Sequence, residues 1–302
     1  MKAVQFSEFG GPEVLRVADA EEPHAGPGQV RVAVRGAGVN PVDWKVRSGA
    51  MQQFMPIELP SIPGSDVAGV IDEVGDGVTD VAVGDEVFGF AVGGGAAEHA
   101  VMEHYATKPA GLSWAEAAGL PVAVETAART LDLLGLEPGQ TILVNGAAGG
   151  VGTAAVQFAR ARGARVIGTA SESNHEYLRT LGAQPTTYGD GLVERVRELA
   201  PGGVDLALDT AGRGALPELI EITGGPEHVV TTADFSAAEH GVRVTTGADE
   251  RSWGALGQAA QLSEAGEFTL PVARTFPFDQ APEAHRISED GHVRGKLVLV
   301  PG

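Results

Sequence analysis

The sequence of 302 residues is long enough for two domains, because compact domains usually contain about 100–200 residues. Its 21 Lys and Arg residues face 40 Asp and Glu residues, and the net charge of −19 disfavours a nucleic-acid partner or an anionic membrane surface. The chain has no cysteine, which excludes disulfides, thiolate zinc sites, iron–sulfur clusters and cysteine nucleophiles. It also lacks a signal-peptide pattern and an apolar run of roughly 18 residues. We therefore expect a cytoplasmic protein with no membrane partner.

The first hundred residues are predicted to be all-β. Short β-branched runs at residues 29–34 and 67–71 alternate with turn residues, among them Gly10-Gly11-Pro12 and Gly75-Asp76-Gly77. This pattern is typical of a small barrel or sandwich.

Helical and strand patterns alternate beyond about residue 115. Ser113 is the predicted N-cap of a helix, with Glu116 three residues later. Four apolar runs that suit buried strands follow, separated by helical stretches, and they lie at residues 141–144, 164–169, 204–209 and 228–232. The alternation predicts an α/β lobe with a doubly wound parallel sheet. A last strand, at residues 296–300, is available to rejoin the first lobe.

A glycine-rich loop lies between the first strand and the first helix of this sheet. Gly146, Gly149 and Gly152 follow one another at three-residue intervals. Backbone N–H groups of such a loop can approach a diphosphate, and the positive end of the following helix favours its charge. A tight turn is the alternative in so glycine-rich a chain, but the position between strand and helix favours a dinucleotide. The predicted cofactor contacts are Asn145, Gly146, Ala147, Ala148, Gly149, Gly150, Val151 and Gly152.

The end of the second strand bears on which dinucleotide is bound. An Asp or Glu at this position would hold the ribose hydroxyls of NAD and repel the extra phosphate of NADP. The strand here ends in Gly168-Thr169-Ala170-Ser171, without an acid. Ser171 and Ser173 can donate to a 2′-phosphate, with Asn174 and Tyr188 as further donors, so we expect NADPH. Glu172 is the open alternative, because a shift of one or two residues would bring it to the ribose.

Five motifs in this order resemble the zinc-independent quinone oxidoreductases, the zeta-crystallin-like group of the medium-chain dehydrogenase/reductase superfamily. They are residues 9–15 (FGGPEVL), 37–44 (AGVNPVDW), 63–69 (PGSDVAG), 84–89 (GDEVFG) and the glycine-rich loop. The resemblance implies a GroES-like β-barrel lobe from residues 1–116 and 271–302. It also implies a Rossmann lobe from residues 117–270, an active site in the cleft and a homodimer.

The same resemblance speaks against a catalytic zinc. Alcohol dehydrogenases of the superfamily have a zinc-binding cysteine where this chain has Asn40, and the histidine of a Gly-His-Glu motif where it has Ser65. Neither an amide nor a hydroxyl is a good zinc ligand. We therefore expect no metal and an acceptor that is already electrophilic, such as a quinone or an activated alkene.

Residues of the first lobe are expected by resemblance to position the nicotinamide and the substrate. Asn40 and Asp43 match the family segment beside the nicotinamide, although Asn40 before Pro41 is also an ordinary turn. Trp44 is expected to wall the substrate pocket, with a place in the core as the alternative. No general acid can be assigned from the sequence.

Further cofactor contacts are carried over from the family. Thr126 matches a threonine near the cofactor, with a hydrogen bond to its own helix as the alternative, and family members often have an apolar residue where this chain has Glu125. Lys296 is expected to reach the cofactor, with a solvated edge-strand charge as the alternative. Two strand ends are expected to line the nicotinamide and its ribose, and they comprise Thr210, Ala211, Thr232, Ala233, Asp234 and Phe235.

Together these observations predict an NADPH-dependent reductase of quinones or α,β-unsaturated carbonyls that works without zinc. An enoyl or alkenal reductase of the same superfamily is the nearest alternative. An NADPH-binding sensor or structural protein with little turnover is the alternative from another class.

Overall fold

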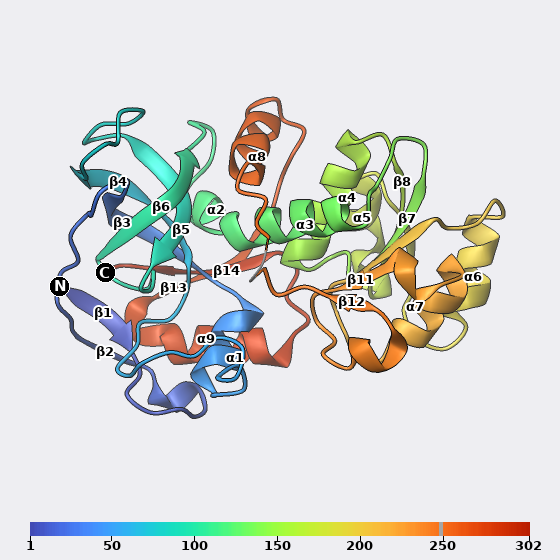
Figure 1. Cartoon of the computed structure of the whole chain (residues 1–302), viewed down its shortest axis with the longest axis horizontal. Helices are drawn as coiled ribbons and strands as arrows, with labels where there is room; N and C mark the ends of the chain where they lie inside the picture. The colour runs from blue at the N-terminus through green and yellow to red at the C-terminus, as the bar shows by residue number, and fades with distance from the viewer. Residues whose placement is uncertain (248–249) are drawn as a thin grey trace. The chain divides into compact units, whose positions relative to one another are not determined.

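The computed structural model describes residues 1–247 and 250–302, which form two compact units (Figure 1). The first comprises Met1–Val122 and Leu256–Gly302, and the second Ala123–Ala255. The division into residues 1–116 with 271–302 and residues 117–270 remains a prediction about the domains. None of the helices formed by the described residues is long and apolar enough to cross a membrane.

The strands are β1 (Lys2–Gln5), β2 (Arg16–Asp19), β3 (Val30–Val39), β4 (Asp66–Val74), β5 (Glu86–Val92), β6 (His99–Thr107), β7 (Thr141–Asn145), β8 (Arg165–Thr169), β9 (Gln184–Thr186), β10 (Leu206–Asp209), β11 (Val229–Thr231), β12 (Arg243–Val244), β13 (Val272–Pro277) and β14 (Lys296–Val300). The helices are α1 (Pro41–Arg47), α2 (Trp114–Ala118), α3 (Pro121–Leu133), α4 (Gly150–Ala161), α5 (His175–Thr180), α6 (Leu192–Leu199), α7 (Leu216–Thr223), α8 (Ala255–Glu264) and α9 (Ala281–Asp290).

The first unit is built around a six-stranded sheet in the order β13-β14-β3-β4-β5-β6. β3 also pairs with β6, so β3 to β6 close into a small barrel, as the alternating pattern predicts. β14 pairs antiparallel with β3, which confirms that the last strand rejoins the first lobe. Val30, Val32 and Val34 alternate into the barrel core because successive side chains of a strand point to opposite faces.

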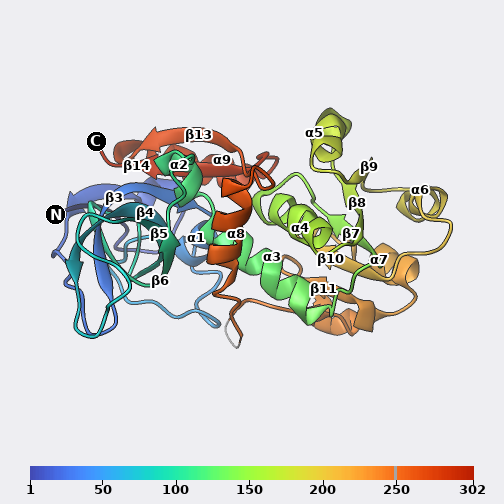
Figure 2. The same cartoon turned by 90° about the horizontal axis from the view of Figure 1, so that it is seen from above.

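A second apolar cluster of this unit lies where α9 packs on β14 and β3. Phe276, Ala281, Ala284 and Leu299 are fully or almost fully buried in it. Figure 2 shows α9 beside β13 and β14. The packing fixes the beginning of β14, where Lys296 lies.

Two helix starts of the first unit follow from their sequences. Ser113 accepts a hydrogen bond from the Glu116 N–H and Glu116 reaches back to the Ser113 N–H, which confirms the predicted cap of α2. Asn40 begins α1, a helix that the strand pattern does not predict. Pro41 suits the first helical position because its fixed φ is helical and no N–H is needed there.

The second unit contains a six-stranded sheet in the order β12-β11-β10-β7-β8-β9, with every neighbouring pair parallel. This confirms the doubly wound sheet, to which the structure adds the short strands β9 and β12. Leu143 of β7 packs with residues of α6 and α7 on one face of the sheet. Figure 1 shows α4 and α7 on opposite sides of the sheet. All the strands end at one edge, where the candidate site lies.

Candidate functional site

The three spaced glycines of the loop between β7 and α4 have three different roles. Gly146 has a φ of +80°, and a Cβ there would lie 2.8 Å from Thr210 Oγ1. A Cβ at Gly152 would lie 2.2 Å from the Gly146 oxygen, so only glycine allows α4 to pack this closely on the loop. A Cβ at Gly149 would meet nothing nearer than the Gly146 oxygen at 3.4 Å. Gly149 therefore leaves open space, as the second glycine of a diphosphate-binding turn does.

The helix that follows this loop offers an anion site. α4 is twelve residues long, and its N-cap, Gly149, has no side chain to satisfy the first N–H groups. Such unpaired N–H groups carry the positive end of the helix dipole and suit a phosphate. The loop itself is held to the next strand by the Ala147 N–H, which donates to the Thr169 oxygen over 3.0 Å. The open space and the free helix start fit the diphosphate of a dinucleotide.

A buried chain of hydrogen bonds crosses four neighbouring strands at the edge where this loop begins. Thr169 Oγ1 of β8 donates to Asn145 Oδ1 of β7 over 2.6 Å. Asn145 Nδ2 donates to Asp209 Oδ1 of β10 over 2.8 Å, and Thr231 Oγ1 of β11 donates to Asp209 Oδ2 over 2.7 Å. All four side chains are buried. The chain fixes the edge of the sheet on which the predicted cofactor contacts lie.

The same groups shape the loops after β10 and β11. Asp209 Oδ1 accepts from the Ala211 and Gly212 N–H groups, and Thr231 Oγ1 accepts from the N–H groups of Ala233 and Asp234. Thr169 and Thr231 are not among the predicted contacts, and Asp209 is predicted only as the end of a strand whose following residues line the nicotinamide. An acid at the end of the apolar run 204–209 is the signal that could have found Asp209.

The candidates Thr210 and Thr232 also belong to this edge. Thr210 Oγ1 donates to the Asn145 oxygen over 2.7 Å, which joins the loop after β10 to the glycine-rich loop. Thr232 Oγ1 donates to the Asp209 oxygen over 3.4 Å. The structure therefore brings the loops after β7, β10 and β11 together.

The last candidates of the loop after β11 are more exposed. Asp234 accepts hydrogen bonds from the N–H and Oγ of Ser236, and these bonds lower the pKa of its carboxyl. Phe235 is 45% exposed. The loop after β11 therefore places a partly exposed aromatic side chain at this edge.

Three of the predicted phosphate contacts form one polar group after β8. Asn174 Nδ2 donates to Ser171 Oγ over 3.1 Å, and the hydroxyls of Ser171 and Ser173 are 3.1 Å apart. β8 ends at Thr169. None of the three residues Thr169, Ala170 and Ser171 at this strand end is an acid. Glu172 follows, with an exposed side chain.

Tyr188 lies at the same edge, two residues after the neighbouring strand β9 ends. Thr169 of β8 pairs with Thr186 of β9, so Ser171 and Tyr188 each lie two residues beyond this pair. Tyr188 is 54% exposed. Nearby, Arg179 of α5 forms an exposed ion pair with Glu176.

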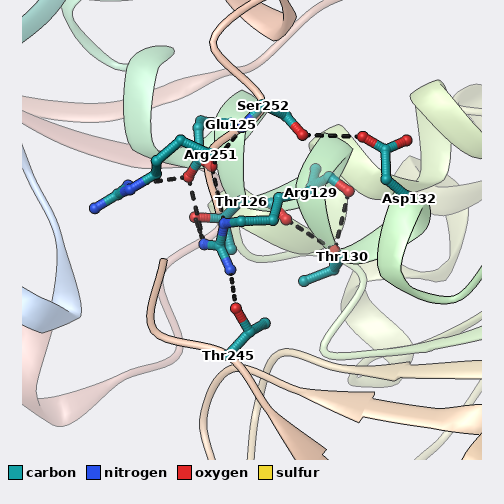
Figure 3. A network of polar contacts seen from close by, with 9 residues as sticks. Glu125, Thr126, Arg129, Thr130, Asp132, Thr245, Arg251 and Ser252 are labelled. Atoms are coloured by element: carbon teal, nitrogen blue, oxygen red, sulfur yellow. Dashed lines mark hydrogen bonds and ion pairs between the residues drawn. The ribbon is translucent and has the colours of Figure 1, made fainter. Parts of the chain in front are cut away.

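Thr126 belongs to a buried polar network of the second unit (Figure 3). Arg129 Nη2 donates to Thr126 Oγ1 over 3.4 Å, and its Nε donates to Glu125 Oε1 over 2.8 Å. Glu125 is fully buried and also accepts from Arg251 Nη1 and the Ser252 N–H, each over 3.1 Å. The network therefore fixes the chain around Arg251 against α3.

The same network reaches the edge of the sheet. Arg129 Nη1 donates to Thr245 Oγ1, and Thr245, directly after β12, donates its N–H to the Thr231 oxygen. Glu125 stands where family members often have an apolar residue, and its sequence position alone does not predict this network. Its partner Arg129 lies four residues along the same helix, but Arg251 and Ser252 lie more than a hundred residues away, so no local pattern could have identified these two.

In the first unit, Asn40, Asp43, Asp66 and Lys296 form one buried group, which we call the Asp43 cluster. Lys296 Nζ donates to Asn40 Oδ1 and, over 3.1 Å, to Asp66 Oδ2. Asn40 Nδ2 donates to Asp66 Oδ2 over 2.9 Å, and the Asn40 N–H donates to Asp43 Oδ2 over 2.7 Å. Lys296 is 4% exposed. The alternative of a solvated edge-strand charge is therefore wrong.

The pKa of Asp43 is strongly raised in this cluster. Burial raises the pKa of Asp43 to about 7, the charge of Asp66 adds to the rise, and the Asn40 N–H and Lys296 oppose it. A carboxyl group with this pKa exchanges its proton near neutral pH. Trp44, the next residue of α1, is partly buried, and its Nε1 has no hydrogen-bond partner in the described part of the chain.

The comparisons with known proteins cover the whole chain. Residues 26–128 match the alcohol dehydrogenase GroES-like domain, and residues 181–299 match the zinc-binding dehydrogenase family. Quinone oxidoreductase of Rattus norvegicus is 33% identical over 325 residues, which cover 99% of this chain and 98% of that protein. The chloroplastic NADPH-dependent alkenal/one oxidoreductase of Arabidopsis thaliana is 34% identical over 318 residues, which cover 100% of this chain and 80% of that protein.

A solved structure agrees with these relatives. Quinone oxidoreductase of Escherichia coli, complexed with NADPH, superimposes with a TM-score of 0.84 at 25% identity and covers 100% of both chains. The barrel unit, the parallel sheet and the glycine-rich loop thus define a medium-chain dehydrogenase/reductase. Within that superfamily, the chain belongs to the quinone oxidoreductase, or zeta-crystallin-like, family.

One feature separates this chain from the zinc enzymes of the superfamily. The positions of the zinc-binding cysteine and histidine hold Asn40 and Ser65. Within residues 1–247 and 250–302, no group of three or more His, Cys, Asp or Glu side chains is arranged to hold a metal ion. Asn40 instead takes part in the Asp43 cluster.

Proposed function

We propose that the protein is an NADPH-dependent reductase that transfers a hydride to a quinone or an α,β-unsaturated carbonyl without zinc. The observation that carries this proposal is the loop between β7 and α4. Its open position at Gly149 and the free N-terminus of α4 fit a diphosphate. The solved relative complexed with NADPH has the same fold over its whole length.

NADPH is proposed over NADH from the end of β8. Ser171, Ser173 and Asn174 form a group of donors where an NAD enzyme would carry an acid. The loops after β10 and β11 are proposed to line the nicotinamide and its ribose, with Thr210, Ala211, Thr232, Ala233, Asp234 and Phe235 as the contacts. Thr126 and Tyr188 are the remaining proposed cofactor contacts in the second unit.

NADPH, when bound, supplies the hydride, and the protein has to position the acceptor, exclude water and stabilise the oxygen that becomes negative. Asn40 and Lys296 are proposed as the positioning groups of the first unit because both offer buried N–H donors. Trp44 is proposed as a wall of the acceptor pocket. Such a site suits an acceptor that needs no Lewis acid.

An alkenal or enone is the second candidate acceptor, supported by the similarity to the Arabidopsis alkenal/one oxidoreductase. Purified protein assayed with NADPH against a naphthoquinone and a linear enone separates the two by kcat/KM. Binding of NADPH without oxidation by either acceptor would overturn the reductase proposal and favour a sensor.

Titration of the protein with NADPH and separately with NADH, followed by nicotinamide fluorescence, tests the cofactor. We expect tighter binding of NADPH and a preference that weakens with salt, because the extra phosphate is charged. Equal or tighter binding of NADH would contradict the proposed role of the Ser171 group and point to Glu172.

A homodimer is also proposed from the family resemblance, and a cytoplasmic location is proposed as well. Sedimentation equilibrium tests the dimer, and a monomer at micromolar concentration would contradict it. Cell fractionation tests the location.

A further inference from the structure

Reduction of a quinone or an enone by NADPH consumes one proton besides the hydride. The oxidised cofactor and the reduced acceptor are formed from NADPH, the acceptor and H⁺, so the proton needs a source. The protein's own source of this proton is sought in the Asp43 cluster, on the basis of the proposed function.

The Asp43 cluster buries more acid than base. Asp43 and Asp66 bring two carboxyl groups to the cluster, whereas Lys296 brings one cationic group, which contacts Asp66. Asp66 is 0% exposed, Lys296 4% and Asp43 7%. An uncompensated buried charge is costly, so a buried group with two acids and one base favours holding one proton.

The hydrogen bonds decide which carboxyl holds that proton. Asp66 accepts from Lys296 Nζ, Asn40 Nδ2 and the Val122 N–H, and three donors stabilise an ionised carboxylate. Asp43 accepts from the backbone N–H of Asn40. The hydrogen-bond donors thus favour a negative charge on Asp66 and a proton on Asp43.

The surroundings of Asp43 agree with this division. Burial makes the largest contribution to the raised pKa of Asp43, which is about 7. The charge of Asp66 on β4 raises this pKa further, and the charge of Lys296 on β14 lowers it. On α1 itself, Arg47 is paired with Glu289. Burial lowers the pKa of Lys45, the other cation of this helix.

Gly64 leaves space beside the carboxyl group. A Cβ built at Gly64 would lie 4.0 Å from Asp43 Oδ2. Because residue 64 is glycine, it places no side chain beside this oxygen. Exchange with water requires an opening to this carboxyl group, and Asp43 as a residue is 7% exposed.

We propose that Asp43 stores the proton consumed in each reduction. The O–H bond of Asp43 breaks, and its proton passes through water to the reduced acceptor. There it forms an O–H bond on a hydroquinone oxygen or a C–H bond on the α-carbon of an enone. The hydride, which carries both electrons, comes from NADPH, and Asp43 recovers a proton from solvent. Asn40 and Asp66 position Asp43 in this scheme.

The first test is spectroscopic and needs no turnover. We expect the infrared C=O band of a protonated carboxyl group in the wild-type protein at pH 6, and its loss as the pH rises through about 7. The band should be absent from Asp43→Asn. Asp85→Asn is the matched control, because exposed Asp85 accepts a backbone N–H three residues away, from Ala82 over 2.9 Å. A band that persists in Asp43→Asn, or its absence from the wild type, would overturn the proposal.

The second test is the pH profile of kcat with NADPH and a naphthoquinone. We expect the wild type and Asp85→Asn to lose activity above about pH 7. Asp43→Asn should lose this inflection and at least about tenfold in kcat, because a positioned acid usually contributes 10²–10⁴-fold. Asp43→Glu should restore part of the inflection. An unchanged profile in Asp43→Asn would overturn the proton store while leaving the reductase function intact. Absence of NADPH oxidation with any acceptor would instead overturn the function, and the infrared test would still decide where the proton lies.

Discussion

Asn145 and Asp209 are joined across neighbouring strands β7 and β10 by a 2.8 Å hydrogen bond from Nδ2 to Oδ1. Asn145 begins the glycine-rich loop, and Asp209 holds the loop after β10 through two backbone N–H groups. One buried carboxylate thereby fixes the geometry of two loops that we propose as cofactor contacts.

Replacement of Asp209 tests this role. Asp209→Ala leaves the Asn145 amide, the Thr231 hydroxyl and two backbone N–H groups without their acceptor, so we expect a loss of about 3 kcal/mol or more in the free energy of unfolding. Asp209→Asn keeps one acceptor oxygen and should cost less. Urea unfolding measures both. A change below about 0.5 kcal/mol for Asp209→Ala would contradict the assignment.

Substitutions of two glycines in the loop should cause different defects. Gly149→Val should weaken NADPH binding by at least about tenfold while the protein stays folded, because its Cβ has room but its branches fill the proposed diphosphate space. Gly152→Ala should instead destabilise the fold, since its Cβ would lie 2.2 Å from the Gly146 oxygen. Gly202→Val is the control because a Cβ there meets nothing within 4 Å. Fluorescence titration and thermal melting separate the two effects. Wild-type affinity in Gly149→Val would refute the diphosphate assignment.

A charge change at Ser171 tests the cofactor preference. Ser171→Asp should weaken NADPH binding about tenfold or more and NADH binding far less, because the new carboxylate repels only the extra phosphate at this position. Gln184→Glu adds the same charge at the exposed first residue of β9 and should change neither affinity. The ratio of the two dissociation constants is the measurement. An unchanged ratio would show that the extra phosphate lies elsewhere.

Glu125 should contribute strongly to the stability of the second unit. Glu125→Leu leaves the guanidinium of Arg129, which is 3% exposed, without its carboxylate, and we expect a loss of about 3 kcal/mol. Glu176→Gln breaks an exposed Glu–Arg pair on α5 and should have little effect, because solvent screens such pairs. Denaturant unfolding compares the variants. Equal small losses would show that the buried pair contributes no more than the exposed one.

His285 should make stability fall in acid. Burial, followed by the charge of Arg47, lowers the pKa of this 1% exposed histidine to about 3. The folded state therefore prefers the neutral ring, and its contribution is present above pH 6.5 and is lost as the pH falls toward 3. His285→Gln should reduce the slope of Tm against pH in this window, whereas exposed His228→Gln should not. An unchanged slope in His285→Gln would contradict this.

Asp43 acts in the opposite direction on stability. Its folded-state pKa is raised above the usual 3.8, so its contribution is present below pH 3.8 and is lost as the pH rises through about 7. This sign distinguishes it from His285 in the same pH series.

The sequence predicted most of the fold because the relevant signals are local. The apolar run at residues 141–144 and the amphipathic stretch after it identify β7 and α4, and the Ser113–Glu116 spacing identifies the cap of α2. The short strands β9 and β12 escaped prediction because two or three residues give no usable period.

Candidate residues of the cofactor loop could be named from the sequence because a strand, spaced glycines and a helix are consecutive in the chain. The partners of the buried polar residues could not be named from the sequence. Glu125 meets Arg251 and Asp66 meets Lys296 across more than a hundred residues, and such pairs exist only once the chain has folded. Lys296 illustrates the difference, because its position on a terminal strand allowed an exposed charge and its burial excludes one.

By itself the sequence determined the class of fold, the absence of thiol chemistry and the position of the glycine-rich loop that we propose binds phosphate, since these follow from composition and from neighbours in the chain. The tertiary structure alone decided which carboxyl groups are buried together and what each accepts. A side chain's pKa and hydrogen bonds depend on the dielectric surroundings and charges that distant segments bring to it, and Asp43 gains both from β4 and β14.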